Sequence, residues 1–139
     1  MRTTVPPVAR PMSLLQRIEV RVLDGEQRLY RVCRPQSDDG FLDAFRSHYE
    51  LGRPPRGPED RAAVLHMALS MFDRIEVARD LAERVPRLGG HVAVLDLRTG
   101  LGMSVAKTGG PAHWSVWGRP AQLVNCVARV APASELGLS

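Results

Sequence analysis

The chain has 139 residues, of which 44% are hydrophobic, and its 19 basic and 15 acidic side chains give a formal net charge of +4. This length and apolar content suit one ordinary domain with its own core. The apolar runs are far shorter than a membrane span, so we expect a cytoplasmic protein that does not enter a membrane. The excess positive charge comes almost wholly from scattered arginines without a basic block, so direct nucleic-acid binding is not supported.

Apolar periodicity divides the chain into three parts. Residues 1–11 are proline-rich and read as a flexible N-terminal arm, residues 12–131 as a single globular domain, and residues 132–139 as a frayed tail. In the first half of the chain we expect strands at 18–23 and 29–33, and then helices at 41–51 and from Pro58 to residue 66. A strand at 69–72 follows and leads into a helix that ends at Val85. In the second half we expect strands at 91–97, 102–107 and 114–117, a helical turn at 120–125, and a last strand at 126–130. This order predicts an α+β domain with a small, mostly antiparallel sheet and two to three short helices.

Two β-hairpins are expected. The Asp24-Gly25 turn predicts that residues 18–23 pair with residues 29–33. The strand at 91–97 is the clearest in the sequence, and residues 102–107 are expected to pair back against it.

The segment from residue 68 to residue 85 is a strand that leads directly into an amphipathic helix. Asp73 is expected to cap the helix, and Glu76, three residues on, completes a capping box. The apolar stripe of this helix consists of Ile75, Ala78, Leu81, Ala82 and Val85. Ser70 and Glu83 remain the two polar residues of the segment to which this architecture assigns no task.

Neither the cysteines nor the histidines predict a metal site. Cys33 and Cys126 lie in apolar surroundings without a CxxC spacing, which is typical of two buried thiols. The four histidines lie in separate elements and have no ligand spacing. His113, however, lies beside Trp114, and an indole next to an imidazole can hold a flat ring such as nicotinamide or adenine, although two tryptophans in one short stretch are more often core.

Arg31 alternates with its neighbours in a predicted strand. If Tyr30 faces one side of the sheet, Arg31 faces the other between Leu29 and Cys33. An arginine in that position needs an acidic or phosphate partner, or a route for its side chain to reach solvent. The second reading, an edge-strand arginine in water, is at least as well supported by the sequence.

The order of these features resembles the ADP-ribosyltransferase-like superfamily, and within it the RES-type toxins. The resemblance rests on a strand with Leu29-Tyr30-Arg31, an arginine- and proline-containing loop at 52–57, the strand Leu69-Ser70-Met71-Phe72, a helix rich in alanine and glutamate, and the paired strands that follow. It implies a split, mostly antiparallel sheet that clamps NAD as the substrate, with no metal.

The resemblance also implies roles for individual residues. The cofactor-binding residues would be Tyr30, Arg31, Phe72, His113 and Trp114, and the catalytic residues Ser70 and Glu83. Arg31 would lie near the pyrophosphate, and the nicotinamide between Phe72 and the Trp114 region. Glu83, or less well Glu76, would oppose the positive charge that develops as nicotinamide departs. The expected activity is NAD glycohydrolysis or ADP-ribosyl transfer.

Two other classes of function stay open. The apolar helix faces at 41–49 and 75–85 suit a non-catalytic interaction or regulatory module that forms a homodimer or binds a protein partner. A nucleic-acid-binding protein would instead need one basic face on the first hairpin, made of Arg17, Arg21, Arg28 and Arg34. Glu19 interrupts that face.

Overall fold

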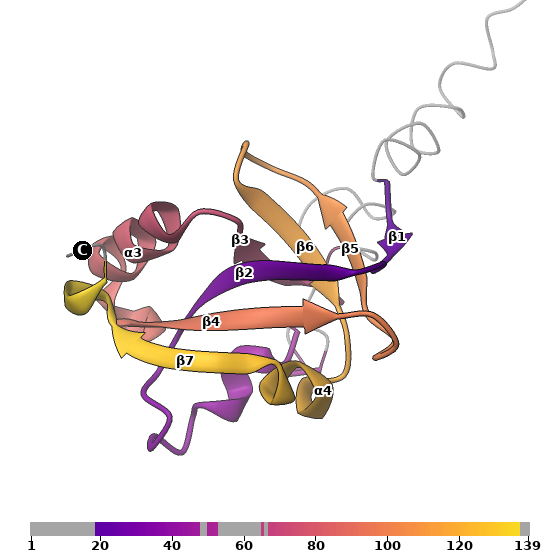
Figure 1. Ribbon diagram of the computed structural model, residues 1–139. Coiled ribbons are helices and arrows are strands. Elements are labelled where there is room, and N and C mark those ends of the chain that lie inside the picture. Colours follow the sequence, from indigo (N-terminus) through magenta and orange to yellow (C-terminus); the bar gives the residue numbers. More distant parts are fainter. Residues whose placement is uncertain (1–18, 48–49, 53–64, 66, 137–139) are drawn as a thin grey trace, which may run out of the picture.

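The computed structural model describes residues 19–47, 50–52, 65 and 67–136, and the described strands form one seven-stranded sheet in the order β1-β5-β6-β3-β2-β4-β7 (Figure 1). Every pairing between these strands is antiparallel. The strands are β1 (Arg21–Val22), β2 (Glu26–Cys33), β3 (Leu69–Phe72), β4 (His91–Arg98), β5 (Ser104–Lys107), β6 (His113–Trp117) and β7 (Val127–Pro132). The helices are α3 (Ile75–Arg84) and α4 (Pro120–Asn125), with 3-10 turns η1 (Leu42–Phe45), η2 (Pro86–Leu88) and η3 (Ala133–Glu135). The predicted α+β class is confirmed.

The sheet opens into a fork between β2 and β3. Strands β2, β4 and β7 lie side by side in one half, and β2 pairs with β4 over all eight of its residues. The other half holds β1, β5, β6 and β3. A single register pair, Tyr30 with Phe72, joins β2 to β3. The two halves therefore separate beyond this pair, at the end of the sheet where β2 finishes and β3 begins.

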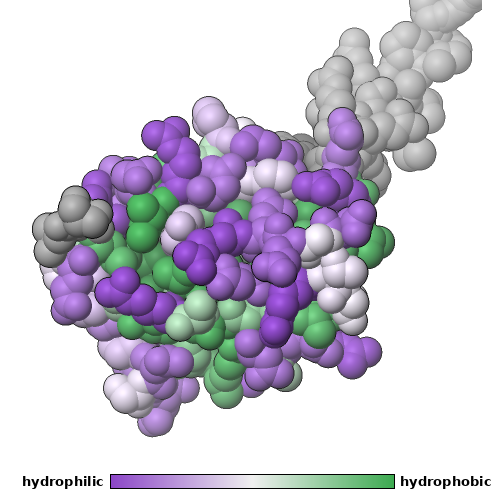
Figure 2. All heavy atoms as spheres, in the orientation of Figure 1, coloured by the Kyte–Doolittle hydropathy of each residue, from purple (hydrophilic) through white to green (hydrophobic). Residues whose placement is uncertain are grey.

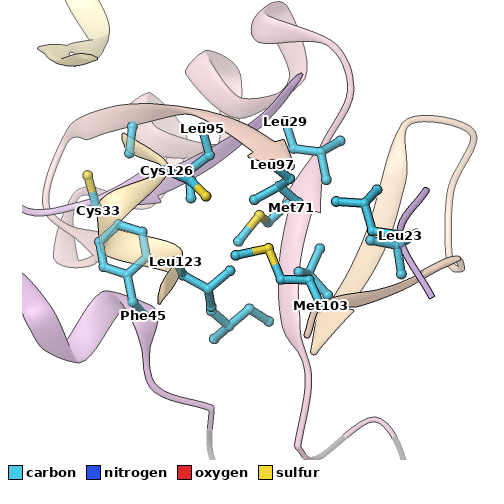
Figure 3. Close-up of a cluster of buried hydrophobic side chains, with 14 of the residues drawn as sticks. Leu23, Leu29, Cys33, Phe45, Met71, Leu95, Leu97, Met103, Leu123 and Cys126 are labelled. Carbon is cyan, nitrogen blue, oxygen red and sulfur yellow. The ribbon is translucent and has the colours of Figure 1, made fainter. Parts of the chain in front are cut away.

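Alternate residues of each strand point to opposite sides of the sheet, and both of its faces are covered. On one face, Leu29, Met71 and Leu95 pack with Phe45 of η1 and Leu123 of α4 (Figure 3). On the other face, α3 lies across β2 and β4. There the buried side chains are Val32, Ala78, Ala82, Val92, Ala131, Ala133 and Leu136. On the surface seen in Figure 2, hydrophilic side chains are spread widely, with smaller hydrophobic areas between them.

Neither expected hairpin is formed. β1 pairs with β5, with Arg21 opposite Val105, rather than with β2. β5 pairs with β1 and β6 rather than with β4. A strand has only two edges: those of β2 are occupied by β3 and β4, and those of β4 by β2 and β7. The chain does bend at Gly25, with φ of 91°, but the carbonyl oxygen of Gly25 accepts a hydrogen bond of 3.0 Å from the amide of Thr99.

The expected helix at 41–51 is much shorter than predicted. It is a 3-10 turn that ends at Phe45, because Arg46 has an extended backbone with φ of −104° and ψ of 135°. Ser47 then starts a new turn: its amide donates to Glu50 Oε1 at 2.7 Å, and the amide of Glu50 donates to Ser47 Oγ at 3.2 Å. This reciprocal pair is a capping box. Apart from Leu65, the helix expected from Pro58 to residue 66 lies outside the described residues, as does the arm at 1–11.

Helix α3 is present, but it is not capped as predicted. Its N-cap residue is Arg74, which makes no side-chain capping bond, and the carboxylate of Asp73 is directed elsewhere. Two residues of the predicted apolar stripe, Ala78 and Ala82, are buried as expected. The C-terminal segment also differs from the prediction, since residues 133–136 are not frayed but pack against α3. None of the helices in the described part of the chain is both long and apolar enough to cross a membrane.

Candidate functional site

Arg31 spans the fork between β2 and β3. Its Nη1 donates a hydrogen bond of 2.7 Å to the main-chain oxygen of Ser70, and its Nε donates to the main-chain oxygen of Ala44 in η1. The alternation of β2 places Arg31 on the face opposite α3, on the same side as Leu29 and Cys33. Arg31 therefore does not simply reach into solvent from an edge strand, because it links three separate elements.

A cavity of about 290 Å³ lies at this end of the fork. We call it the fork pocket; its lining residues are Arg31, Arg34, Gly40, Asp43, Ala44, Arg46, Leu51, Leu65, Ala68, Leu69, Ser70, Arg87 and Leu88. Asp43 is the only carboxylate among these lining residues, and it forms an ion pair with Arg46. Within the described residues, the arginines at positions 31, 34 and 87 have no acidic partner. The fork pocket therefore carries a net positive charge.

No carboxylate within the described part of the chain neutralises the charge of Arg31. Both of its hydrogen-bond acceptors are uncharged carbonyl groups. Desolvation lowers the pKa of Arg31 to about 10, which still leaves the guanidinium cationic at neutral pH. A partly buried cation without a counter-ion is costly, and an anion bound in the fork pocket would reduce that cost.

The neighbouring thiol of Cys33 does not supply a nucleophile. It is buried and free, as is Cys126, in agreement with the sequence prediction. Desolvation raises the pKa of Cys33 to about 12, although Arg31 opposes part of this effect. Because the thiolate is the nucleophilic form, Cys33 is inert at neutral pH.

Of the three residues expected to share a pocket, two come together. Arg31 and Ser70 both line the fork pocket, and they are joined through the carbonyl group of Ser70. Glu83 is an exposed residue of α3, which covers the opposite face of the sheet, and it is not among the lining residues. Glu76 is also exposed on α3, and its Oε1 lies 3.8 Å from Nε of Arg74.

The aromatic residues are divided between the two faces. In the β3–β6 register, Phe72 lies opposite His113, and the two rings make an edge-to-face contact with centroids 5.5 Å apart. Tyr30 and Phe72 pack on the α3 side. Trp114, the next residue after His113, points to the opposite face and donates from Nε1 to Asp73 at 2.9 Å. No flat ring can therefore be sandwiched between Phe72 and Trp114.

The remaining arginines of the pocket were not identified as site residues from the sequence. Arg34 directly follows β2, and Arg87 lies in η2, shortly before β4. Because Cys33 pairs with His91, these two arginines meet at one end of the sheet. The pairing of β2 with β4 is therefore the feature that would have identified Arg34 and Arg87 as site residues.

Nor do the described arginines form the basic face considered above, since Arg28 donates hydrogen bonds of 2.7 and 2.9 Å to the carboxylate of Asp96. Arg17 lies outside the described residues.

Among the residues that the structure describes, no group of three or more His, Cys, Asp or Glu side chains is arranged to hold a metal ion. Comparisons with protein families, curated proteins and solved structures find no match to this chain.

Proposed function

We propose that the protein binds a small phosphate-bearing ligand in the fork pocket. The observation that carries this proposal is Arg31, which two neutral carbonyl groups hold in place beside Arg34 and Arg87 and which has no carboxylate partner among the residues that the structure describes. Arginine presents a planar set of donors that matches the oxygens of phosphate. Because the main-chain bonds already orient Arg31, little side-chain entropy is lost when a ligand binds.

The size of the pocket limits the ligand. A volume of about 290 Å³ lies at the lower end of the range of roughly 300–1,000 Å³ that small-molecule sites occupy. This favours a group no larger than a mononucleotide, such as the pyrophosphate portion of NAD, over a whole dinucleotide. The resemblance to ADP-ribosyltransferase-like proteins makes NAD the natural first ligand to test.

The geometry supports binding better than it supports cleavage of the nicotinamide–ribose bond. That reaction needs a carboxylate near the developing ribosyl cation. The expected carboxylate, Glu83, lies on α3 on the other side of the sheet from Arg31. Among the described lining residues the only carboxylate is Asp43, and it is already paired with Arg46.

Calorimetric titration with pyrophosphate, ADP-ribose and NAD tests the proposal. We expect binding that weakens with added salt. Arg34→Gln and Arg87→Gln should each weaken it by roughly tenfold, because each removes a charge-assisted hydrogen bond. Arg98→Gln, in an exposed residue at the other end of β4, is the matched control and should bind normally. Failure of all three compounds to bind at millimolar concentration, or equal binding by Arg34→Gln and the unchanged protein, would reject the proposal.

The same samples test catalysis. Incubation with NAD followed by chromatography measures the release of nicotinamide. Binding without release supports the ligand-binding function stated here, whereas release that is lost in Glu83→Gln would establish the enzymatic reading and would place Glu83 in the site.

A second candidate, a protein-interaction module, is favoured by the exposed apolar residues. Among the described residues, Leu42, Met67 and Leu88 are exposed by 48%, 51% and 37%. Leu88 lines the fork pocket, and the other two adjoin lining residues in the chain. Such clustering is typical of a contact surface. Light scattering after size-exclusion chromatography tests a homodimer, and Leu88→Gln should dissociate it.

A further inference from the structure

The fork pocket lies at the start of β3, and a second cavity, of about 260 Å³, lies at the end of the same strand. We call it the aromatic pocket; its lining residues are Phe72, Arg74, Val77, Gly110, Pro111, Ala112 and His113. The rings of Phe72 and His113 meet edge to face at 74°, and Val77 and Pro111 add apolar surface. Among these described residues, Arg74 contributes the only formally charged side chain.

Hydrogen bonding fixes the protonation pattern of His113. Its Nδ1 lies 2.9 Å from the main-chain oxygen of Thr108, and a carbonyl oxygen can only accept a hydrogen bond. Nδ1 therefore carries the proton, and in the neutral ring Nε2 presents a lone pair. Within the described part of the chain, Nε2 has no hydrogen-bond partner. The aromatic pocket thus combines an apolar wall with one acceptor of defined position.

The walls of the pocket are held in place by main-chain bonds. The amide of Asp73 donates to the oxygen of Ala112 at 2.9 Å, and the amide of His113 donates to the oxygen of Gly110 at 3.1 Å. The hydroxyl groups of Thr108 and Ser115 are 2.7 Å apart, which fixes the residue that orients the imidazole. A preformed site of this kind loses less entropy when it binds a ligand than a flexible one.

Arg74 remains available for an anion. Its Nε lies 3.8 Å from Glu76 Oε1, and the two side chains are exposed by 64% and 55%. An exposed ion pair at this distance contributes little, so an incoming carboxylate can compete with Glu76 for the guanidinium. The described lining thus offers an aromatic surface, a hydrogen-bond acceptor and a cation within one small cavity.

We propose that the aromatic pocket binds a small aromatic carboxylate that bears a hydroxyl or amino donor. The ring packs against Phe72, the donor bonds to Nε2 of His113, and the carboxylate pairs with Arg74. This site is separate from the fork pocket, and it does not depend on the function proposed there.

Three probes divide these contributions: 4-hydroxybenzoate has the ring, donor and carboxylate, benzoate lacks the donor, and phenol lacks the carboxylate. Binding is followed by amide chemical shifts of the full chain, with peaks from Val77 and Ala112 as reporters. We expect 4-hydroxybenzoate to bind tightest. His113→Phe should weaken it by roughly fivefold, the effect of one neutral hydrogen bond, and should leave benzoate unchanged. Arg74→Gln should weaken both carboxylates and leave phenol unchanged, and Arg84→Gln, at the far end of α3, is the matched control.

The benzoate arm shows whether His113→Phe keeps the pocket intact, and Arg74→Gln alters only an exposed side chain, so a folding defect in one variant leaves the other informative. The proposal is overturned if the reporters do not shift with millimolar 4-hydroxybenzoate. It is also overturned if His113→Phe binds 4-hydroxybenzoate as tightly as the unchanged protein does, or if Arg74→Gln behaves like Arg84→Gln.

Discussion

The carboxylate of Asp73 accepts a hydrogen bond of 2.9 Å from Nε1 of Trp114. The same oxygen lies 3.2 Å from Nζ of Lys107. Asp73 follows β3, Trp114 belongs to β6 and Lys107 to β5, so one carboxylate connects three neighbouring strands. Arg21 of β1 completes the group, since its guanidinium lies 5.7 Å from the centre of the Trp114 ring. This cluster holds together the half of the sheet that carries both β3 and the aromatic pocket.

Replacement of Asp73 tests whether it supports the sheet or caps α3. We expect Asp73→Ala to lower the free energy of unfolding by about 1–2 kcal/mol, since Trp114 and Lys107 both lose a partner. Asp73→Asn should cost less, because the amide oxygen still accepts from the indole. Urea denaturation followed by tryptophan fluorescence measures both. Glu76→Ala is the control: if it is as costly as Asp73→Ala, the capping-box interpretation would be correct after all.

The same carboxylate makes the protein sensitive to acid. The hydrogen bond from Trp114 is the main reason that the pKa of Asp73 lies below its ordinary value of 3.8, and a hydrogen bond from Arg28 does the same for the pKa of Asp96. Because both groups hold protons more weakly in the folded state, the unfolded chain takes up more protons as the pH falls. Stability is therefore fully present above the ordinary value and declines as the pH drops below it.

Urea midpoints measured in steps from pH 6 to pH 2.5 should show this decline. Asp73→Asn should show a shallower decline, because it removes one of the two carboxylates whose pKa is lowered by folding. Parallel curves for the variant and the unchanged protein would contradict the assigned role of Asp73.

The elements that local sequence patterns specify were predicted well, whereas those that depend on distant partners were not. The apolar stripe of α3 is a local pattern, and it gave a helix at Ile75–Arg84 with Ala78 and Ala82 buried. The cap was assigned from the same local pattern, but the side chain of Asp73 bonds to Trp114, which is 41 residues away. A capping rule weighs only neighbours in the chain and cannot detect such a competitor.

Strand pairing failed for a similar reason. Alternation predicts that a segment is a strand, but says nothing about which other strand lies beside it. The Asp24-Gly25 sequence predicts a hairpin, yet β2 already has β3 and β4 on its two edges. The arginine lining of the fork pocket depends on that pairing, so only Arg31 and Ser70 could be found from sequence.

A close contact at Gly89 supports the arginine end of the fork pocket. Gly89 has φ of 119°, and a Cβ atom placed on it would contact the main-chain oxygen of Cys33 and lie 2.7 Å from Cα of Arg34. Both are backbone groups that cannot rotate away. We expect Gly89→Ala to cost roughly 3 kcal/mol or more. Gly90→Ala, also at positive φ but with no atom within 4 Å of the added Cβ, should cost only about 1 kcal/mol. Thermal unfolding of both variants provides the comparison, and equal losses would exclude the close approach.

Arg31 has a structural role and a proposed binding role, and two variants separate them. Arg31→Met leaves the carbonyl groups of Ala44 and Ser70 without their donor, while it also removes a desolvated charge, so we expect a net loss of about 1–3 kcal/mol. Arg34→Gln alters an exposed side chain and should leave the stability of the free protein nearly unchanged.

A ligand that binds only the folded state stabilises it by an amount that grows with the logarithm of the ligand concentration relative to Kd. Pyrophosphate should therefore raise the unfolding temperature of the unchanged protein, raise it less for Arg34→Gln, and leave that of Arg31→Met unaffected. If Arg31→Met is destabilised but still gains as much from pyrophosphate as the unchanged protein, then Arg31 serves only to hold the fork between β2 and β3, and the anion binds elsewhere.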